Sequence, residues 1–184
     1  FQLDREDNDE TGIADLAGQI MGEFVRTKVV PEVDAYCLSK LARYAMDNNQ
    51  TITGTPASQA YKMFTEAVSK SQSVVGYDED LVAFVDGTFW TALQTTSEMS
   101  RLLTVTNFKK GDVDFEVKSI NGIPILPVPD SRMKTEYHFL SGSAGEESGG
   151  FVPTATAKKI GLLLMPKRAA SLVKKTDQVR TFEP

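Results

Sequence analysis

The first residues of the chain carry its densest group of side chains that could do chemistry. Five carboxylates lie within seven residues, namely Asp4, Glu6, Asp7, Asp9 and Glu10. A calcium loop needs oxygen ligands at alternate positions, a glycine at the sixth position and a bidentate glutamate at the twelfth. A loop counted from Asp7 has Gly12 at its sixth position, but its twelfth residue is Gly18, which has no side chain. The calcium-loop pattern therefore fails at the ligand that closes the site.

The acidic cluster instead indicates the start of a helix. Asp9 or Thr11 can cap the free N–H groups of a helix, and carboxylates are favoured at the positive end of its dipole. The sequence therefore predicts no metal site here. A small metal-dependent hydrolase that uses the Asp4–Glu10 cluster, with His138 as a further candidate, stays as an alternative. Apolar residues follow the cluster at helical spacing: Ile13, Leu16, Ala17, Ile20 and Phe24.

The other reactive side chains are few. Cys37 is the single cysteine, so no internal disulfide can form, and its place on an apolar helical stripe predicts a small buried hydrophobic residue. His138 is the single histidine, which excludes a site with several histidine ligands. The sequence contains no G-x-S-x-G motif, no phosphate-binding loop and no G-x-G-x-x-G turn. We therefore predict a protein that is not an enzyme and has no catalytic residues and no cofactor.

The composition describes a globular chain. It has 184 residues, of which 41% are apolar and 24% charged, with a formal net charge of −5. This length allows one large domain or two small ones. No apolar run is long enough to cross a bilayer, and the mild acidity argues against tight non-specific binding of nucleic acid. Because the chain begins with Phe1, we expect it to be a trimmed segment of a longer protein.

The helical pattern in the first part of the chain is unusually long. It runs from Ile13 to Met46 and would span roughly 50 Å if it were helical throughout. Pro31 should kink or interrupt it, since proline lacks the N–H and disfavours helix at Val30. A compact globule of this chain length is only about 40 Å across. The pattern therefore predicts an elongated body, or one that rests on neighbouring subunits.

The middle of the chain predicts a helix and then a sheet. Pro56, with Thr55 as its cap, should start a helix that ends near Ser69, and the polar stretch 71–80 is a candidate domain boundary. Residues 81–87 form a short apolar run typical of a buried strand, and residues 88–96 a short helix. Asn121-Gly122 is a strong signal for a β-hairpin. Its returning strand should lie at a sheet edge or leave the sheet, because it carries Pro124, Pro127 and Pro129. At an edge, a monomeric adaptor could bind a peptide along it.

The last third of the chain mixes a polar loop with short elements. Residues 141–150 are rich in glycine and serine and predict an exposed, mobile loop. Residues 160–165 predict a second buried strand, Pro166 the start of a helix, and residues 177–184 a final strand. Segregated helices and mostly antiparallel strands indicate the α+β class.

Five stretches of the sequence, in order and over nearly the whole chain, resemble the major capsid protein of tailed bacteriophages and prophages. They are FQLDREDNDET, GEFVRTKVVPEVDAYCLSKLA, LVAFVDGTFWTAL, INGIPILPVPDSRM and VRTFEP. The resemblance implies the Hong Kong ninety-seven type of shell fold. It implies an elongated peripheral domain with a long spine helix (residues 1–73 and 174–184) and an inserted axial α+β domain with a mostly antiparallel sheet (residues 74–173). On this resemblance, we expect the amino-terminal arm and extended hairpin loop of that family to have no counterpart in these residues.

The resemblance also implies a function. We expect a structural subunit that self-assembles into the pentamers and hexamers of an icosahedral capsid in the virion, formed in the host bacterial cytoplasm. Its partners would be copies of itself, with scaffolding or portal proteins as further candidates, and it would enclose DNA without sequence-specific binding and without a membrane. Loop 141–150 should meet symmetry-related copies and be disordered outside the shell, because ordering it costs roughly 1–2 kcal/mol per residue. The candidate contact residues are Ser141, Gly142, Ser143, Gly149 and Gly150.

Overall fold

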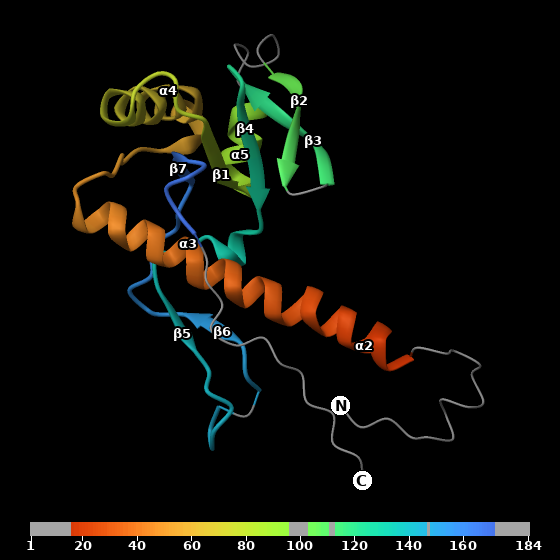
Figure 1. The fold of residues 1–184 in the computed structure, drawn as a ribbon. Helices are drawn as coiled ribbons and strands as arrows, with labels where there is room; N and C mark the ends of the chain where they lie inside the picture. The colour runs from red at the N-terminus through yellow and green to blue at the C-terminus, as the bar shows by residue number, and fades with distance from the viewer. Residues whose placement is uncertain (1–15, 96–102, 111–112, 147, 172–184) are drawn as a thin grey trace. The chain divides into compact units, whose positions relative to one another are not determined.

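The computed structural model of the chain describes residues 16–95, 103–110, 113–146 and 148–171 (Figure 1). It confirms the predicted α+β class, because helices occur together with two sheets whose recorded strand pairs are antiparallel. By their internal contacts, the described residues divide into two compact units. Among the described helices, none combines the length and the apolar character that a membrane span needs.

The two units have boundaries other than those of the predicted domains. The first unit contains residues 16–51 and 128–160, and the second contains residues 52–127 and 161–171. The stretch 52–73 therefore joins the sheet, because its helix packs into the core there, and the stretch 128–160 joins the long helix. The assignment of a peripheral and an axial domain stays a prediction.

The first unit is built on one long helix. Its three segments are α2 (Leu16–Phe24), the π-helical turn η1 (Val25–Val29) and α3 (Val30–Asp47), which follow one another without a break (Figure 1). This confirms the predicted long helix. We call these three segments together the long helix.

Pro31 widens the long helix instead of ending it. The Val30 amide donates to the carbonyl of Val25, five residues earlier, which is the hydrogen bond of a π-helix. In an α-helix, residue 31 would have to donate to the carbonyl of Thr27, which proline cannot do, and its ring would clash with that carbonyl. The hydroxyl of Thr27 donates to the carbonyl of Glu23 at 2.7 Å and so satisfies an acceptor in the turn before the distortion.

The second half of the long helix carries the small core of the first unit. Its buried residues lie in α3, which contacts η3 (Asp130–Arg132) and β5 (Tyr137–Phe139). An ion pair of 2.8 Å between Arg132 and Asp34 fastens η3 to the helix. Strand β5 pairs antiparallel with β6 (Phe151–Pro153) to form a hairpin. The buried residues of α3 are Ala35, Leu38, Ser39 and Ala42.

The second unit contains a sheet of five described strands in the order β2-β3-β4-β1-β7. Helices α4 (Pro56–Val75) and α5 (Gly87–Thr95) contact each other, and α4 also contacts β7 while α5 contacts β1. Phe64 of α4 is buried, and Tyr61 and Val68 pack against the same core, as predicted. The strands are β1 (Leu81–Asp86), β2 (Leu103–Lys110), β3 (Val113–Ile120), β4 (Ile123–Val128) and β7 (Leu162–Pro166).

Two local predictions in the second unit are confirmed. Strand β1 and helix α5 form where expected, and Phe89 and Leu93 of α5 are fully buried. The hairpin of β3 and β4 turns at Asn121 and Gly122, whose φ angles of 52° and 78° are both positive. Positive φ at both central residues is what the tight hairpin turn requires and what Asn-Gly adopts at low cost.

The predicted edge position of the proline-bearing strand is wrong. Strand β4 lies between β3 and β1, in the middle of the sheet. Ile123 and Ile125 are buried there, and the strand pairs with β3 next to the turn, where Pro124 lies opposite Ser119. A proline is tolerated in a strand where no ladder acceptor faces its nitrogen. Burial of the two isoleucines therefore outweighs the hydrogen bonds that the prolines cannot make.

Three other boundaries differ from the predictions. Helix α4 continues to Val75, so the stretch 71–75 is helical rather than a link. Strand β7 is present, but it is half-buried at the sheet edge. The predicted helix after Pro166 is wrong for the described residues 167–171, which make a turn in which the Ala169 amide donates to the carbonyl of Pro166. The predicted final strand 177–184 lies outside the described residues.

Candidate interaction surface

The residues predicted as metal or enzyme candidates do not form a site in the described part of the chain. The Asp4–Glu10 cluster lies outside the described residues. Within those residues, no group of three or more histidine, cysteine, aspartate or glutamate side chains could hold a metal ion. Cys37 is half-buried, and burial, together with the nearby charge of Asp34, raises the pKa of its thiol. Such a thiol is a weak nucleophile at neutral pH.

Loop 141–150, which connects β5 to β6, holds the predicted contact residues. It is mostly exposed, as expected, but it closes on itself through its backbone. The Leu140 amide donates to the carbonyl of Gly150 at 2.8 Å, and the Glu146 amide donates to the carbonyl of Ser143 at 2.8 Å. Gly142, Gly149 and Gly150 have φ angles of 75°, 59° and 89°, a region that glycine enters without steric cost. The glycines therefore allow the turns by which the loop closes, in addition to making its backbone more flexible.

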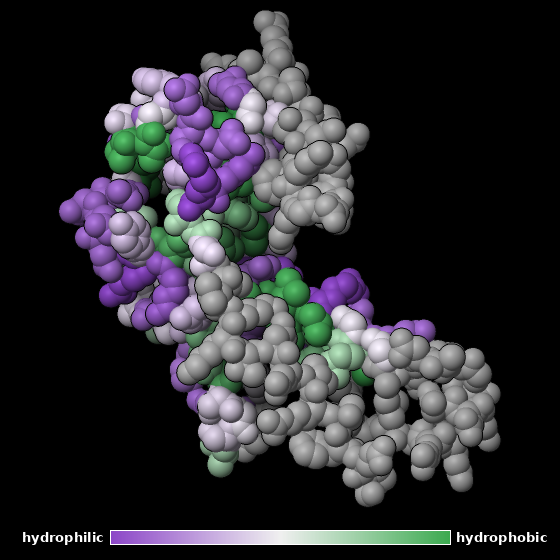
Figure 2. Space-filling model, in the orientation of Figure 1, coloured by the Kyte–Doolittle hydropathy of each residue, from purple (hydrophilic) through white to green (hydrophobic). Residues whose placement is uncertain are grey.

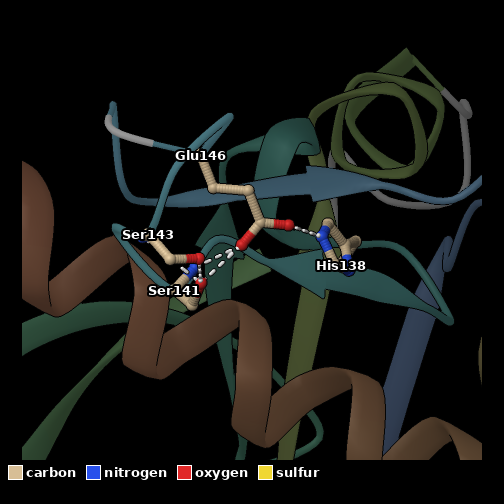
Figure 3. A network of polar contacts seen from close by, with 4 residues as sticks. All are labelled: His138, Ser141, Ser143 and Glu146. Carbon is tan, nitrogen blue, oxygen red and sulfur yellow. Dashed lines mark hydrogen bonds and ion pairs between the residues drawn. The ribbon is translucent and has the colours of Figure 1, made fainter.

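A single carboxylate organises the side chains of this loop. Oε2 of Glu146 accepts hydrogen bonds from the Ser141 amide at 2.8 Å and from the Ser141 hydroxyl at 2.7 Å. Oε1 of Glu146 lies 2.7 Å from Nε2 of His138 on β5, and the Ser141 and Ser143 hydroxyls lie 2.7 Å apart (Figure 3). The two oxygens of one side chain thus join the strand, the start of the loop and its middle.

The environment of Glu146 favours its ionised form. The Ser141 amide is the largest cause, followed by the Ser141 hydroxyl and by His138, and together they lower the pKa of Glu146 to about 2. Hydrogen bonds to a carboxylate stabilise the charged form and so lower its pKa. The sequence prediction did not name Glu146, and it named His138 only for the hydrolase alternative. No spacing pattern in the sequence points to the bond between Glu146 and the Ser141 amide.

Aromatic rings join the hairpin of β5 and β6 to the long helix. The ring centroids of Tyr36 on α3 and Phe139 on β5 lie 5.7 Å apart in an edge-on arrangement, and those of Tyr137 and Phe151 lie 5.3 Å apart. The Tyr137 hydroxyl donates to the carbonyl of Ser131 at 2.8 Å, and burial raises its pKa. An open apolar hollow of about 360 Å³ lies beside these rings, lined by Glu32, Val33, Tyr36 and Phe139.

The first half of the long helix contributes almost nothing to the core. None of residues 18–34, all of which the structure describes, is buried, and Ala35 is the first buried residue after them. Phe24, Val25 and Val30 are 37%, 39% and 43% exposed. Figure 2 shows hydrophobic surface on the long helix between the positions labelled α3 and α2 in Figure 1. Exposed apolar side chains that gather on one element mark an interaction surface.

Comparisons with protein-family models, with curated proteins and with solved structures find no match to this chain.

Proposed function

We propose that the chain is a structural subunit that associates with copies of itself into a closed shell around DNA, as in the capsid of a tailed bacteriophage. Each interface of such a shell is of modest strength, and the many symmetric repeats together make the assembly stable. The formal net charge of −5 suits a container, because a subunit that gripped phosphates tightly would hinder the packing and release of DNA.

The observation that carries the proposal is the helix from Gly18 to Asp34, which has no buried side chain. Most helical stability in proteins comes from packing of one face, and short helices without such packing are marginal in water. The same stretch exposes Phe24, Val25 and Val30, which lose contact with water only if another surface covers them. A second copy of the chain is the partner that the proposal assigns to this surface.

The hairpin of β5 and β6 supports a second contact at loop 141–150. Ser141, Gly142 and Ser143 are exposed, so they are accessible to a neighbouring copy, whereas Gly149 and Gly150 are half-buried. The expectation that this loop lies near the centre of a ring comes from its assignment to the axial domain, and that assignment stays a prediction. By its internal contacts, the loop belongs to the unit of the long helix. The proposal concerns the contact itself.

Two alternatives have their own tests. The metal-dependent hydrolase depends on Asp4, Asp7 and Asp9, so calorimetric titration with calcium or manganese decides it, with Asp7→Ala and Asp9→Ala as controls. The peptide-binding adaptor needed the proline-bearing strand at a sheet edge, and β4 lies inside the sheet. Sedimentation separates the adaptor from a shell subunit, since an adaptor stays small at every concentration.

Electron microscopy and sedimentation of the full-length protein test the proposal. A shell subunit gives rings or closed particles and a sedimentation coefficient that rises with concentration. A protein that remains a monomer at every concentration, with no particles in the micrographs, contradicts it.

A further inference from the structure

We infer that Glu146 is a positioning residue that closes loop 141–150 in the free subunit, so that the loop meets a second copy already shaped. The identity of the partner rests on the proposed function, whereas the closing of the loop does not. The inference reverses the expectation from composition, which was a loop that stays disordered until a neighbour orders it.

The geometry places Glu146 where one side chain restrains several parts of the hairpin. Its carboxylate binds the Ser141 amide at the start of the loop. The same carboxylate also contacts His138 on β5, which lies three residues before Ser141 in the chain. Its own amide donates to Ser143, and its carbonyl accepts from Gly149 at 3.1 Å. Side chain and backbone of the same residue thus connect β5 with both halves of the loop.

A carboxylate strengthens these bonds. An ionised carboxylate only accepts hydrogen bonds, and it can accept them on both oxygens at once. Bonds to a charged acceptor are roughly twice as strong as those between neutral groups. An alanine at position 146 removes both acceptors, whereas a glutamine can still turn its oxygen to the Ser141 amide and its amide group to His138. Among the described residues, His138 is the ionisable group in contact with the carboxylate.

A preformed loop lowers the free-energy cost of binding a neighbouring copy. Segments that fold on binding lose affinity because ordering them opposes the contact energy, and restraining them beforehand removes that cost. The glycines provide the turns, and Glu146 selects one closed conformation among those that the glycines allow. A variant without the carboxylate should therefore form the same pair of strands, β5 and β6, which we call the stem, with a more flexible loop between them.

Amide hydrogen exchange, measured by NMR on the full chain diluted until it is monomeric, tests the inference. In the wild-type chain the Ser141 amide should be protected, and Glu146→Ala should speed its exchange by roughly tenfold. The matched control is Glu136→Ala, because Glu136 belongs to the same unit but accepts from the hydroxyls of Thr154 and Thr156. This control should leave Ser141 exchange unchanged.

A second measurement separates positioning from a general loss of structure. After correction for intrinsic rates, Ser141 protection should fall with acid as Glu146 becomes protonated in the wild-type chain, and should not follow that titration in Glu146→Ala. The Leu140 amide, which bonds to Gly150, reports whether the stem survives. Exchange of Ser141 at the rate of an unstructured peptide in the wild-type chain, or equal protection in Glu146→Ala, overturns the inference. Self-association of the full-length protein tests the proposed function separately, so failure of one is distinguishable from failure of the other.

Discussion

The amide of Val30 donates its hydrogen bond to the carbonyl of Val25, five residues earlier, in the turn directly before Pro31. This bond shows how the long helix accommodates a proline in its interior without ending. One extra residue in the turn removes the need for an N–H at position 31. The same extra residue rotates everything before it relative to α3, so it sets which direction Phe24 and Val25 face.

Replacing Pro31 by alanine tests this account of the helix. The variant gains the missing N–H, so the helix can return to the α form, and we expect the free energy of unfolding to rise by about 1 kcal/mol. Helix content, measured by circular dichroism, should not fall. A clear loss of helix in Pro31→Ala would show that the π-helical turn has another cause.

The start of α5 depends on a buried cap. Oδ1 of Asp86 accepts a 2.8 Å hydrogen bond from the Phe89 amide, and Asp86 is itself buried. We expect Asp86→Ala to lower the free energy of unfolding by about 1–2 kcal/mol, measured by urea denaturation, because an N-cap side chain is lost. Thr55→Ala is the control, since Thr55 caps α4 without a side-chain hydrogen bond and its loss should change stability by less than about 0.5 kcal/mol. Equal effects of the two variants would count against the cap.

Two glycines that lie in open space should respond to alanine in opposite directions. Gly122 has a φ of 78°, so Gly122→Ala should cost on the order of 1 kcal/mol by strain in the hairpin turn. Gly22 lies within α2, and Gly22→Ala should stabilise the helix by up to about 1 kcal/mol. Thermal unfolding measures both. A stabilised Gly122→Ala would contradict the turn geometry.

The loop hydrogen bonds predict an unusual acid titration. The pKa of Glu146 is lowered from 4.5 to about 2 by the Ser141 amide, the Ser141 hydroxyl and His138. A carboxylate with a lowered pKa contributes its stabilisation above its unfolded-state pKa, and loses it as the pH falls through the folded-state value. The contribution of Glu146 should therefore be complete above about pH 4.5 and disappear towards about pH 2. NMR titration of the side-chain carboxyl carbon measures this, and a midpoint near 4.5 would refute it. Ser141→Ala removes one of the donors and should raise the midpoint.

Local sequence signals predicted much of the second unit. The residues Asn121 and Gly122 alone determine their hairpin turn. The apolar runs of β1 and α5 are buried because neighbouring elements cover both. The central place of β4 could not be predicted in the same way. It depends on β1, which is far away in the sequence, and on the burial of Ile123 and Ile125.

The other missed features also depend on partners distant in the sequence or on single bonds. Two ion pairs hold the turn after Pro166. Lys167 pairs with Asp80 at 3.3 Å, and Arg168 pairs with Glu79 at 2.6 Å. The spacing of apolar residues after Pro166 could not predict these ion pairs, because their acidic partners lie far away in the sequence. In loop 141–150, composition predicted exposure correctly, but it did not show that Glu146 would bind the Ser141 amide.

The exposed part of the long helix gives the prediction on which the proposed function depends. Val30→Asp places a charge among Phe24 and Val25 and should weaken self-association of the full-length protein by at least about fivefold in Kd, because a charge would be buried at the contact. Ala57→Asp is the control. Ala57 is small and exposed in the first turn of α4, in the other unit, so an aspartate there should leave self-association as it was.

Sedimentation velocity of the full-length protein, with Val30→Asp and Ala57→Asp beside the wild type, tests the central claim most directly. We expect large assemblies for the wild type and for Ala57→Asp, and predominantly small species for Val30→Asp. A wild-type protein that sediments as a monomer at every concentration, or a Val30→Asp variant that assembles as well as the wild type, would contradict the account.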